Sequence, residues 1–287
     1  MKTDSIQSAI PQPGNPEIRP GQSVELLKQL HILTRDGRLN QDSRRKLKQV
    51  YHLYQFIEPL LQQVKHEHAA VTLVDHGAGK SYLGFILYDL FFKSLKDGSH
   101  IYGVETREEL VAHSRDLAQR LGFGGMSFLN LSVEESIATP SLPDRVNMVT
   151  ALHACDTATD DAIRFALAKQ AQFIVLVPCC QAEVAAVLRK NKGKLLGREV
   201  LTELWRHPIH TREFGSHVTN VLRCLQLEAH GYQVTVTELV GWEHSMKNEL
   251  IIARYKNLPR QRAAQRLDDI MQMLGLEELK PRFFADA

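Results

Sequence analysis

The segment spanning residues 71–83 carries the residue types best suited to bind a cofactor. An apolar run ends in Asp75, glycines follow at Gly77 and Gly79, and an apolar stretch begins at Tyr82. This pattern predicts a strand, a tight loop and a helix. Glycines let the backbone pass close to a ligand, and the first N–H groups of a helix point toward it. We therefore expect a nucleotide-like cofactor here, with all four of these residues lining it.

Three classes of cofactor fit this loop to different degrees. A phosphate-binding P-loop needs a glycine where this chain has Val74. A dinucleotide loop needs its third glycine where this chain has the much larger Tyr82. S-adenosylmethionine is a cation without phosphates, so the acid Asp75 suits it better than it suits a polyphosphate. The predicted cofactor is therefore S-adenosylmethionine.

A second acid, Glu105, ends another short apolar run behind the glycine pair. An acid after the second strand of a nucleotide-binding unit can accept hydrogen bonds from both ribose hydroxyls. The alternative is that Glu105 only caps the helix that starts near Thr106. Its spacing behind the glycines favours the ribose.

Composition and length predict one medium-sized enzyme. The chain has 287 residues with 44% hydrophobic content, enough for one α/β domain with helical additions. Residues 1–22 contain four prolines, lack the apolar core of a signal peptide, and are expected to form an extended arm. The longest apolar stretch, residues 82–92, is too short to cross a bilayer. We expect a cytoplasmic protein without a membrane partner, and no obligate protein partner can be inferred.

Periodic apolar residues predict two helices ahead of the glycine loop. Leucines between residues 26 and 33 form one stripe, and apolar residues between 47 and 61 form another. The expected N-cap of the second helix is Asp42, and Pro59 is expected to kink or end it. Residues 23–65 are therefore predicted to form an N-terminal helical hairpin.

Strands and helices alternate through the middle of the chain. Strands are expected at residues 126–131, 146–152 and 173–177, with helices at 107–121 and 162–169, and Asp160 is expected to cap the latter. Successive units of this kind predict a parallel, doubly wound sheet. Residues 234–240 and 250–255 are too close for a helical crossover and must pair as an antiparallel hairpin. Residues 66–256 thus form the predicted catalytic domain, and residues 257–287 form a helical tail.

Two local patterns mark the ends of the later strands. Ser132 and Val133 follow the third strand, where the adenine edge of the cofactor would lie. The fourth strand ends in Leu152-His153-Ala154-Cys155-Asp156, with Ala-Thr-Asp close behind, and the fifth ends in Pro178-Cys179-Cys180.

These last two segments resemble those of one methyltransferase family. It includes the tRNA 2′-O-methyltransferases of the Trm-thirteen type, the methyltransferase-like-25 proteins and the methyltransferase module of the glutathione-S-transferase-C-terminal-domain-containing protein. The resemblance implies a Rossmann-like class I methyltransferase fold, S-adenosylmethionine bound partly at Leu152, and RNA as the favoured substrate. Asp156 departs from the family, which usually has glycine at this position.

Catalytic chemistry leaves a faint trace in this sequence, because methyl transfer depends mainly on positioning. His153 lies where a strand end would face the methyl group, so a neutral imidazole there could accept a hydroxyl proton. The alternative is that His153 holds the loop through a backbone hydrogen bond. The four cysteines, at 155, 179, 180 and 224, lack metal-ligand spacing, so reduced thiols and no metal are expected.

Basic residues are clustered although the net charge is only +2. Such clusters either bind phosphates or form ordinary solvated faces. RNA contacts are expected at Arg44, Arg45, Lys190 and Lys192. The alternatives are a methyltransferase for a protein or small molecule, and an inactive nucleic-acid-binding protein that retains the fold. The three clusters are Arg35, Arg38, Arg44, Arg45, Lys46 and Lys48; Arg189, Lys190, Lys192, Lys194 and Arg198; and Arg254, Lys256, Arg260, Arg262 and Arg266.

Overall fold

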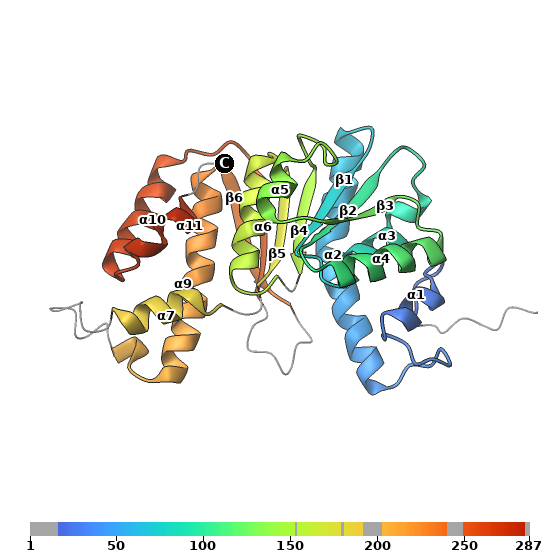
Figure 1. Cartoon of the computed structure of the whole chain (residues 1–287), viewed down its shortest axis with the longest axis horizontal. Helices are drawn as coiled ribbons and strands as arrows, with labels where there is room; N and C mark the ends of the chain where they lie inside the picture. Colours follow the sequence, from blue (N-terminus) through green and yellow to red (C-terminus); the bar gives the residue numbers. More distant parts are fainter. Residues whose placement is uncertain (1–16, 153, 179–180, 192–202, 240–248, 285–287) are drawn as a thin grey trace, which may run out of the picture.

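A seven-stranded sheet forms the centre of the molecule (Figure 1). The computed structural model describes residues 17–152, 154–178, 181–191, 203–239 and 249–284. The strands are β1 (Thr72–His76), β2 (His100–Glu105), β3 (Met126–Asn130), β4 (Met148–Leu152), β5 (Phe173–Val177), β6 (Tyr232–Glu238) and β7 (Glu249–Tyr255).

The strand order confirms the predicted topology. The order is β3-β2-β1-β4-β5-β7-β6, and β1 to β5 are parallel wherever they pair. β7 runs antiparallel to both β5 and β6, which is the predicted terminal hairpin. The parallel strands β1 to β5 therefore all end at one edge of the sheet, called the carboxyl edge below, while β7 ends at the opposite amino edge.

Helices cover both faces of the sheet, because successive residues of a buried strand face opposite cores. Leu73 packs in the core under the first group of helices and Val74 in the core under the second. The first group is α1 (Val24–Gln29), α2 (Gln41–Glu67), α3 (Tyr82–Leu90) and α4 (Glu108–Leu121). The second is α5 (Val133–Ala138), α6 (Thr157–Ala168) and α9 (Pro208–Ala229).

Helix α9 carries a further layer on its outer side. It packs against α7 (Glu183–Lys190), α10 (Gln261–Met273) and α11 (Lys280–Phe283) through a separate apolar cluster that includes Trp205 and Leu222. A Cβ on Gly215 would meet the Ala185 Cα at 2.7 Å, so α7 and α9 touch at their backbones. Short 3-10 turns lie at Phe92–Ser94, Glu203–Trp205 and Glu277–Leu279. None of the helices within the described ranges is long and apolar enough to span a membrane.

The two helices predicted near the N-terminus are present, but their details differ from the prediction. The N-cap of α2 is Asn40, whose side chain accepts a hydrogen bond from the Ser43 N–H at 2.8 Å, while Asp42 pairs with Lys46. Pro59 lies inside α2 and does not end it. The helix continues to Glu67 because its apolar face stays buried against the core, and this burial outweighs the lost backbone hydrogen bond.

The described part of the predicted arm lies on α2. The Arg19 N–H donates to the Tyr51 hydroxyl at 3.1 Å. The Arg19 guanidinium lies 5.0 Å from the ring centroid of Tyr51 and 4.8 Å from that of Tyr54. These contacts anchor the start of the described chain beside the first group of helices.

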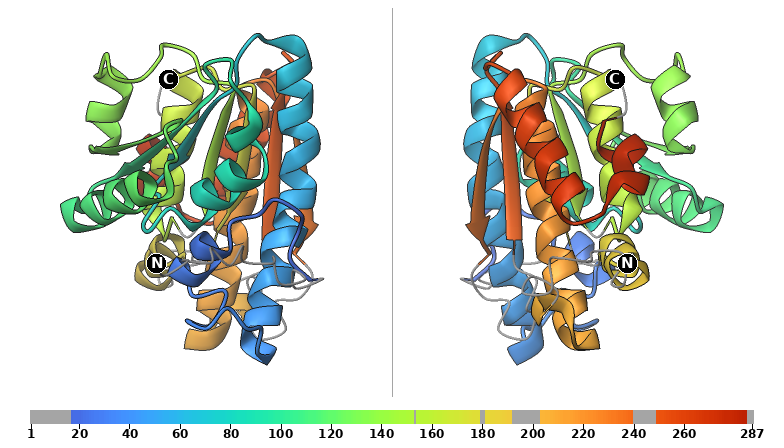
Figure 2. Two further views of the ribbon diagram at one scale, coloured as in Figure 1. Left: turned by 90° about the vertical axis from the view of Figure 1, so that its right-hand side faces the viewer. Right: turned by 90° about the vertical axis from the view of Figure 1, so that its left-hand side faces the viewer.

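The N-terminal parts of α2 and α9 project beyond the carboxyl edge of the sheet (Figures 1 and 2). Both helices run from this end toward the amino edge, where each connects to the next strand, β1 or β6. They therefore form two walls on either side of the loops in which a doubly wound sheet binds its ligands.

A buried ion pair fastens α9 to α6. Arg223 is fully buried and its Nε and Nη2 donate to the two Asp160 carboxylate oxygens at 2.7 and 2.9 Å. Nη2 also donates to the Asp156 carbonyl at 2.7 Å. The expectation that Asp160 caps its helix was wrong, because α6 starts at Thr157, five residues earlier than predicted, and places Asp160 inside the helix.

This ion pair gives a prediction for stability. Replacing Arg223 by Leu should lower the free energy of unfolding by about 3–5 kcal/mol, because the Asp160 carboxylate is left buried and unpaired. Arg164→Leu is the matched control: Arg164 pairs with Glu134 at the surface, so its loss should change stability little. Equal losses for both variants in urea denaturation would contradict this role of the Arg223 pair.

Candidate functional site

The glycine loop (residues 77–81) lies against the ends of β2 and β4. Gly77 and Gly79 have φ angles of +66° and +57°, which favour glycine. The Ala78 N–H donates to the Val104 carbonyl at 3.0 Å. A Cβ on Gly77 would meet the Ala154 Cβ at 3.3 Å, whereas one on Gly79 would have only Arg107 nearby. The face of the loop at Gly79 is therefore the one that a ligand can approach.

Asp75 lies beneath this loop and not on its surface. Its carboxylate accepts hydrogen bonds from the Thr150 hydroxyl at 2.8 Å and the Ser81 hydroxyl at 3.3 Å. Burial raises the pKa of Asp75 to about 7, although these hydrogen bonds and one from the Gly84 N–H act in the opposite direction. Asp75 thus supports the loop from inside and is partly protonated near neutral pH.

His76, which the sequence reasoning missed, is the last residue of β1. Burial lowers its pKa to about 4, so the imidazole is neutral. Its Nε2 lies 3.4 Å from the Ser136 hydroxyl, and its ring centroid is 5.2 Å from that of Phe165. Its Nδ1 is buried without a hydrogen-bond partner among the described residues. A polar residue at the end of an otherwise apolar strand was the signal available in the sequence.

Glu105 reaches the glycine loop from the end of β2. Its Oε2 accepts a hydrogen bond from the Gly79 N–H at 2.8 Å, and its Oε1 accepts one from the Arg107 N–H at 3.1 Å. Burial alone would raise the pKa of Glu105, but hydrogen bonds from Arg107 and Gly79 outweigh it and hold the pKa below its ordinary value. The carboxylate is therefore charged and adjacent to the predicted cofactor loop.

Arg107 covers this carboxylate. Its Nε lies 3.0 Å from Oε1 of Glu105 and its Nη2 lies 3.2 Å from Oε2. The Arg107 side chain is 60% exposed, so it can move without disturbing the core. A ribose diol at Glu105 would compete with this guanidinium. The sequence reasoning did not identify Arg107, although a base two residues after a strand-end acid was visible.

The side chains of Ser132 and Val133, which were predicted to lie near the adenine, stabilise the fold. Ser132 is the N-cap of α5 and accepts a hydrogen bond from the Glu135 N–H at 3.3 Å, within a capping box. Val133 is buried in the core between the sheet and the second group of helices. Their side chains are thus committed to the fold, and a contact between either residue and adenine stays a prediction.

Tyr82 and Leu152 lie together, but on the α2 side of the site. Both line a cavity of 340 Å³ between α2 and α3. The Tyr82 hydroxyl donates to the Leu30 carbonyl in the segment after α1. These two residues therefore lie against the projecting part of α2, and a contact between either of them and the cofactor stays a prediction.

Several predicted site residues fall outside the described residues, namely His153, Cys179, Cys180 and Lys192. Cys155 is exposed, and burial raises the pKa of the Cys224 thiol to about 12. Within the described ranges, no three His, Cys, Asp or Glu side chains come close enough together to hold a metal ion. The proposed base at His153 stays a prediction.

The predicted substrate residues that are described form surface ion pairs. Arg44 Nε lies 2.7 Å from Glu17 Oε1, and Lys190 Nζ lies 2.7 Å from Glu278 Oε2. Arg45 is exposed on the first turns of α2. Exposed pairs of this kind are weak, so they can exchange their partners for phosphates.

Comparison with known proteins shows which class of domain this part of the chain resembles. Residues 45–187 match a family model described as a methyltransferase domain. This segment is therefore similar to a methyltransferase domain. It contains the glycine loop, Glu105 and most of α2, and the match supports S-adenosylmethionine as the cofactor. The narrower resemblance to the Trm-thirteen type stays a prediction.

The chain is also similar to solved methyltransferases at low identity. No curated protein matches it. An rRNA methylase from Streptococcus thermophilus is 10% identical, over 72% of this chain and 94% of that one, with a TM-score of 0.41. Magnesium protoporphyrin IX methyltransferase from Synechocystis PCC 6803 with bound SAH is 14% identical, over 81% and 93%, with a TM-score of 0.43. The SAH-bound Podospora anserina methyltransferase PaMTH1 is 12% identical, over 81% and 87%, with a TM-score of 0.44.

The contacts of Glu105 give a prediction for cofactor binding. Glu105→Ala should weaken S-adenosylmethionine binding by about 1.5–3 kcal/mol, the usual value of hydrogen bonds to a charged group. Arg107→Ala should bind the cofactor at least as tightly as the native protein, because it frees the same carboxylate. Isothermal titration calorimetry measures both. Unchanged affinity for Glu105→Ala would show that the ribose binds elsewhere, and a loss for Arg107→Ala would show that the guanidinium contacts the cofactor.

The raised pKa of Asp75 gives a prediction for pH. The folded protein holds a proton on Asp75 that the unfolded chain releases near pH 3.8. The stability linked to this proton is therefore present at low pH and is lost as pH rises through about 7. The uncharged Asp75→Asn variant should lack this loss, so the difference in unfolding free energy between the two proteins should change between about pH 4 and 7. A difference independent of pH would contradict the raised pKa.

Proposed function

We propose that this protein is an S-adenosylmethionine-dependent methyltransferase that acts on RNA. The observation that supports S-adenosylmethionine as the cofactor is the charged Glu105 carboxylate beside Gly79 of the glycine loop, within the segment similar to a methyltransferase domain. A carboxylate there suits the ribose hydroxyls of the cofactor, and the absent P-loop glycine disfavours a polyphosphate.

The residues present fit this cofactor electrostatically. Bound S-adenosylmethionine supplies an activated methyl group on a positively charged sulfur. The charged Glu105 carboxylate lies beside the loop, and the partly ionised Asp75 lies under it. The Arg107 guanidinium balances the charge of Glu105. A cationic ligand would favour the ionised form of Asp75, because opposite charges attract strongly in a partly buried site.

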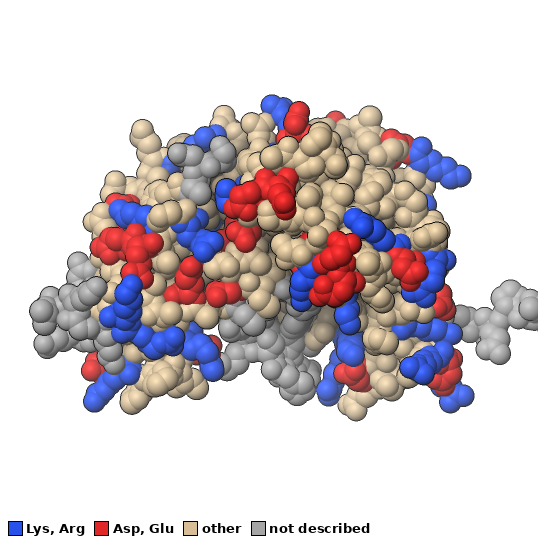
Figure 3. Space-filling view, viewed as in Figure 1, with Lys and Arg blue, Asp and Glu red and all other residues tan. Residues whose placement is uncertain are grey.

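Support for RNA comes from basic side chains on both walls of the carboxyl edge. Arg44, Arg45 and Lys46 lie on the first turns of α2, and Arg189 and Lys190 lie on the last turn of α7, which packs on α9. Figure 3 shows Lys and Arg side chains gathered at these two lower flanks of the molecule. A strand lying across the carboxyl edge would meet positive charge on both sides.

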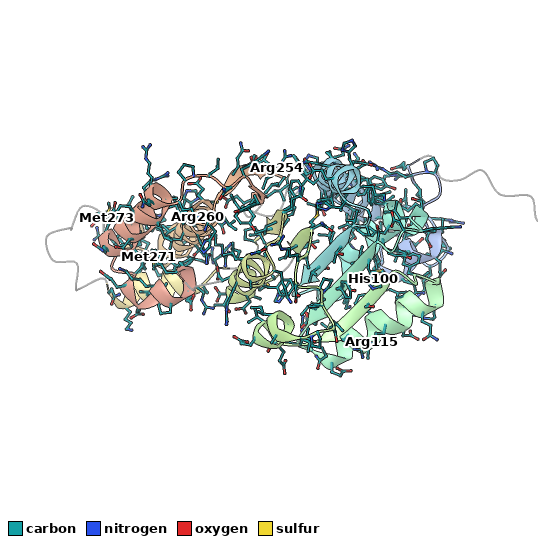
Figure 4. All side chains as sticks on the ribbon, turned by 90° about the horizontal axis from the view of Figure 1, so that it is seen from above. His100, Arg115, Arg254, Arg260, Met271 and Met273 are labelled. Carbon is teal, nitrogen blue, oxygen red and sulfur yellow. The ribbon has the colours of Figure 1, made fainter. Side chains whose placement is uncertain are left out.

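The third basic cluster lies elsewhere. Arg254 pairs in register with Phe173, the first residue of β5, so the cluster begins at the amino edge. Figure 4, which looks onto this edge, shows Arg254 and Arg260 there. The residues expected to contact RNA belong to the first two clusters, so the proposal does not need the third. The third cluster provides matched controls.

The test of the substrate is direct. Tritiated methyl transfer from the cofactor should label total RNA and not protein extract. Label in protein or in small molecules alone would identify the rival methyltransferase function. Bound cofactor with RNA binding but no transfer to any fraction would identify an inactive nucleic-acid-binding protein.

Charge reversal on the two walls should weaken RNA binding. Single-stranded RNA gives a log-log salt slope of about −0.7 per phosphate contact, so Arg44→Glu with Arg45→Glu should weaken binding and flatten the slope by about 1.4. Lys190→Glu with Lys192→Glu should have a similar effect. Neither pair lies on the glycine loop, so cofactor affinity should stay at the native value.

The control for these variants is Lys256→Glu with Arg262→Glu at the amino edge, which should bind RNA like the native protein. Fluorescence anisotropy over a range of salt concentrations measures all the slopes. Equal effects of the wall variants and the amino-edge variant would mean that binding depends on total charge and not on the carboxyl edge.

A further inference from the structure

A cavity beside the cofactor loop has the size and position of a substrate site. Its volume of 340 Å³ lies within the range of about 300–1,000 Å³ that is usual for small-ligand sites. It lies between the projecting part of α2 and the first turns of α3. Its lining includes Lys46, Val50 and Leu53 from α2, Tyr82 and Ile86 from α3, and Leu152 from β4.

The cavity and the glycine loop share the same supporting elements. Tyr82 is the first residue of α3 and directly follows the glycine loop. Leu152 is the last residue of β4, two residues before Ala154, whose side chain lies against Gly77. A group held in this cavity therefore lies next to the loop that holds the cofactor, at the carboxyl edge.

The walls of the cavity select an uncharged ligand. Most of the lining side chains are aliphatic, with the Tyr82 ring among them, and no Asp or Glu lines it among the described residues. The ammonium group of a protein lysine would lose its hydration there without gaining a carboxylate, which is costly. A planar uncharged ring would instead bury apolar surface against these walls.

The rim of the cavity carries positive charge. Lys46 is its one charged lining residue in the described chain, and its Nζ lies 2.8 Å from Asp42 at the surface. Arg45 is the exposed neighbour of Lys46 on α2. An anionic group attached to the buried ring would therefore meet favourable charge at the mouth of the cavity.

We propose that this cavity receives a nucleobase of the RNA substrate, turned out of its stack, with the adjoining phosphate at Lys46. The ring matches the apolar walls, and the phosphate matches the basic rim. Enzymes that modify nucleic acids commonly bind a base in this extruded form. The proposal rests on the proposed function and assigns the position of the substrate within that same site.

The test fills the cavity from its half-buried side. Val50→Trp places a large ring in the cavity from α2, and Gln55→Trp places the same ring on the exposed face of the same helix. Val50→Trp should lower kcat/KM for RNA methylation by about tenfold to a hundredfold, because the acceptor is displaced. Its cofactor affinity and melting temperature should stay native, and Gln55→Trp should resemble the native protein throughout.

A binding measurement separates this proposal from the proposed function. Saturation-transfer NMR with the four nucleoside 5′-monophosphates and S-adenosylhomocysteine should show nucleotide binding to the native protein and Gln55→Trp, but not to Val50→Trp. Lys46→Gln should weaken binding of the nucleotides but not of the corresponding nucleosides, measured in the same way. Lys46→Arg should restore nucleotide binding. Equal binding by Val50→Trp, or no binding by the native protein, overturns the cavity assignment. Binding of this pattern without methyl transfer to RNA leaves the cavity in place and overturns the proposed function.

Discussion

The hydrogen bond from the Gly79 N–H to Glu105 joins the ends of the two strands on which the cofactor site depends. In the parallel register of β1 and β2, His76 pairs with Val104, so Glu105 lies one residue beyond the last pair. The glycine loop turns back over that end, and the Ala78 N–H also bonds to the Val104 carbonyl. The positive φ angles at Gly77 and Gly79 make this close approach available. The conformation of this one loop therefore fixes both the glycine backbone and the position of the Glu105 carboxylate.

Charge around this loop is balanced and adjustable. Asp75 and Glu105 repel each other, and Glu105 contributes to the raised pKa of Asp75. Two features reduce this repulsion. Asp75, below the loop, is partly protonated, and the Arg107 guanidinium lies against the Glu105 carboxylate. Two acids at one loop are easily ionised together only when a cation is present. A positively charged cofactor can therefore neutralise the acids at this loop as Arg107 now does. The electrostatics of the site thus favour a cationic ligand.

The sequence predicted the strands well because buried parallel strands are short continuous apolar runs. β5 occupies the predicted residues 173–177, and the terminal hairpin follows from its short connection. Helix boundaries were harder to predict from the sequence. The capping role of Asn40 depends on local geometry, and Asp160 forms a buried ion pair only because α9 packs against α6. The 22-residue α9 itself was missed, although Pro208 at its first position was a start signal. The sequence contained signals for Arg107 and His76, but their contacts with Glu105 and Ser136 depend on how the strand ends lie in the fold.

Under the proposed function, cofactor binding and substrate recognition depend on different parts of this chain. The predicted cofactor site lies at the strand ends of the sheet, where doubly wound folds generally bind their ligands. The walls are helices added to this sheet. Most of α2 lies within the residues that match the methyltransferase domain, whereas α9 lies beyond them. The Arg223 pair ties α9 to the start of α6 and to the loop after β4, so the second wall is fixed to the catalytic sheet. Buried contacts therefore fix the position of the second wall, and under the proposed function the two walls together would limit which substrates reach the methyl group.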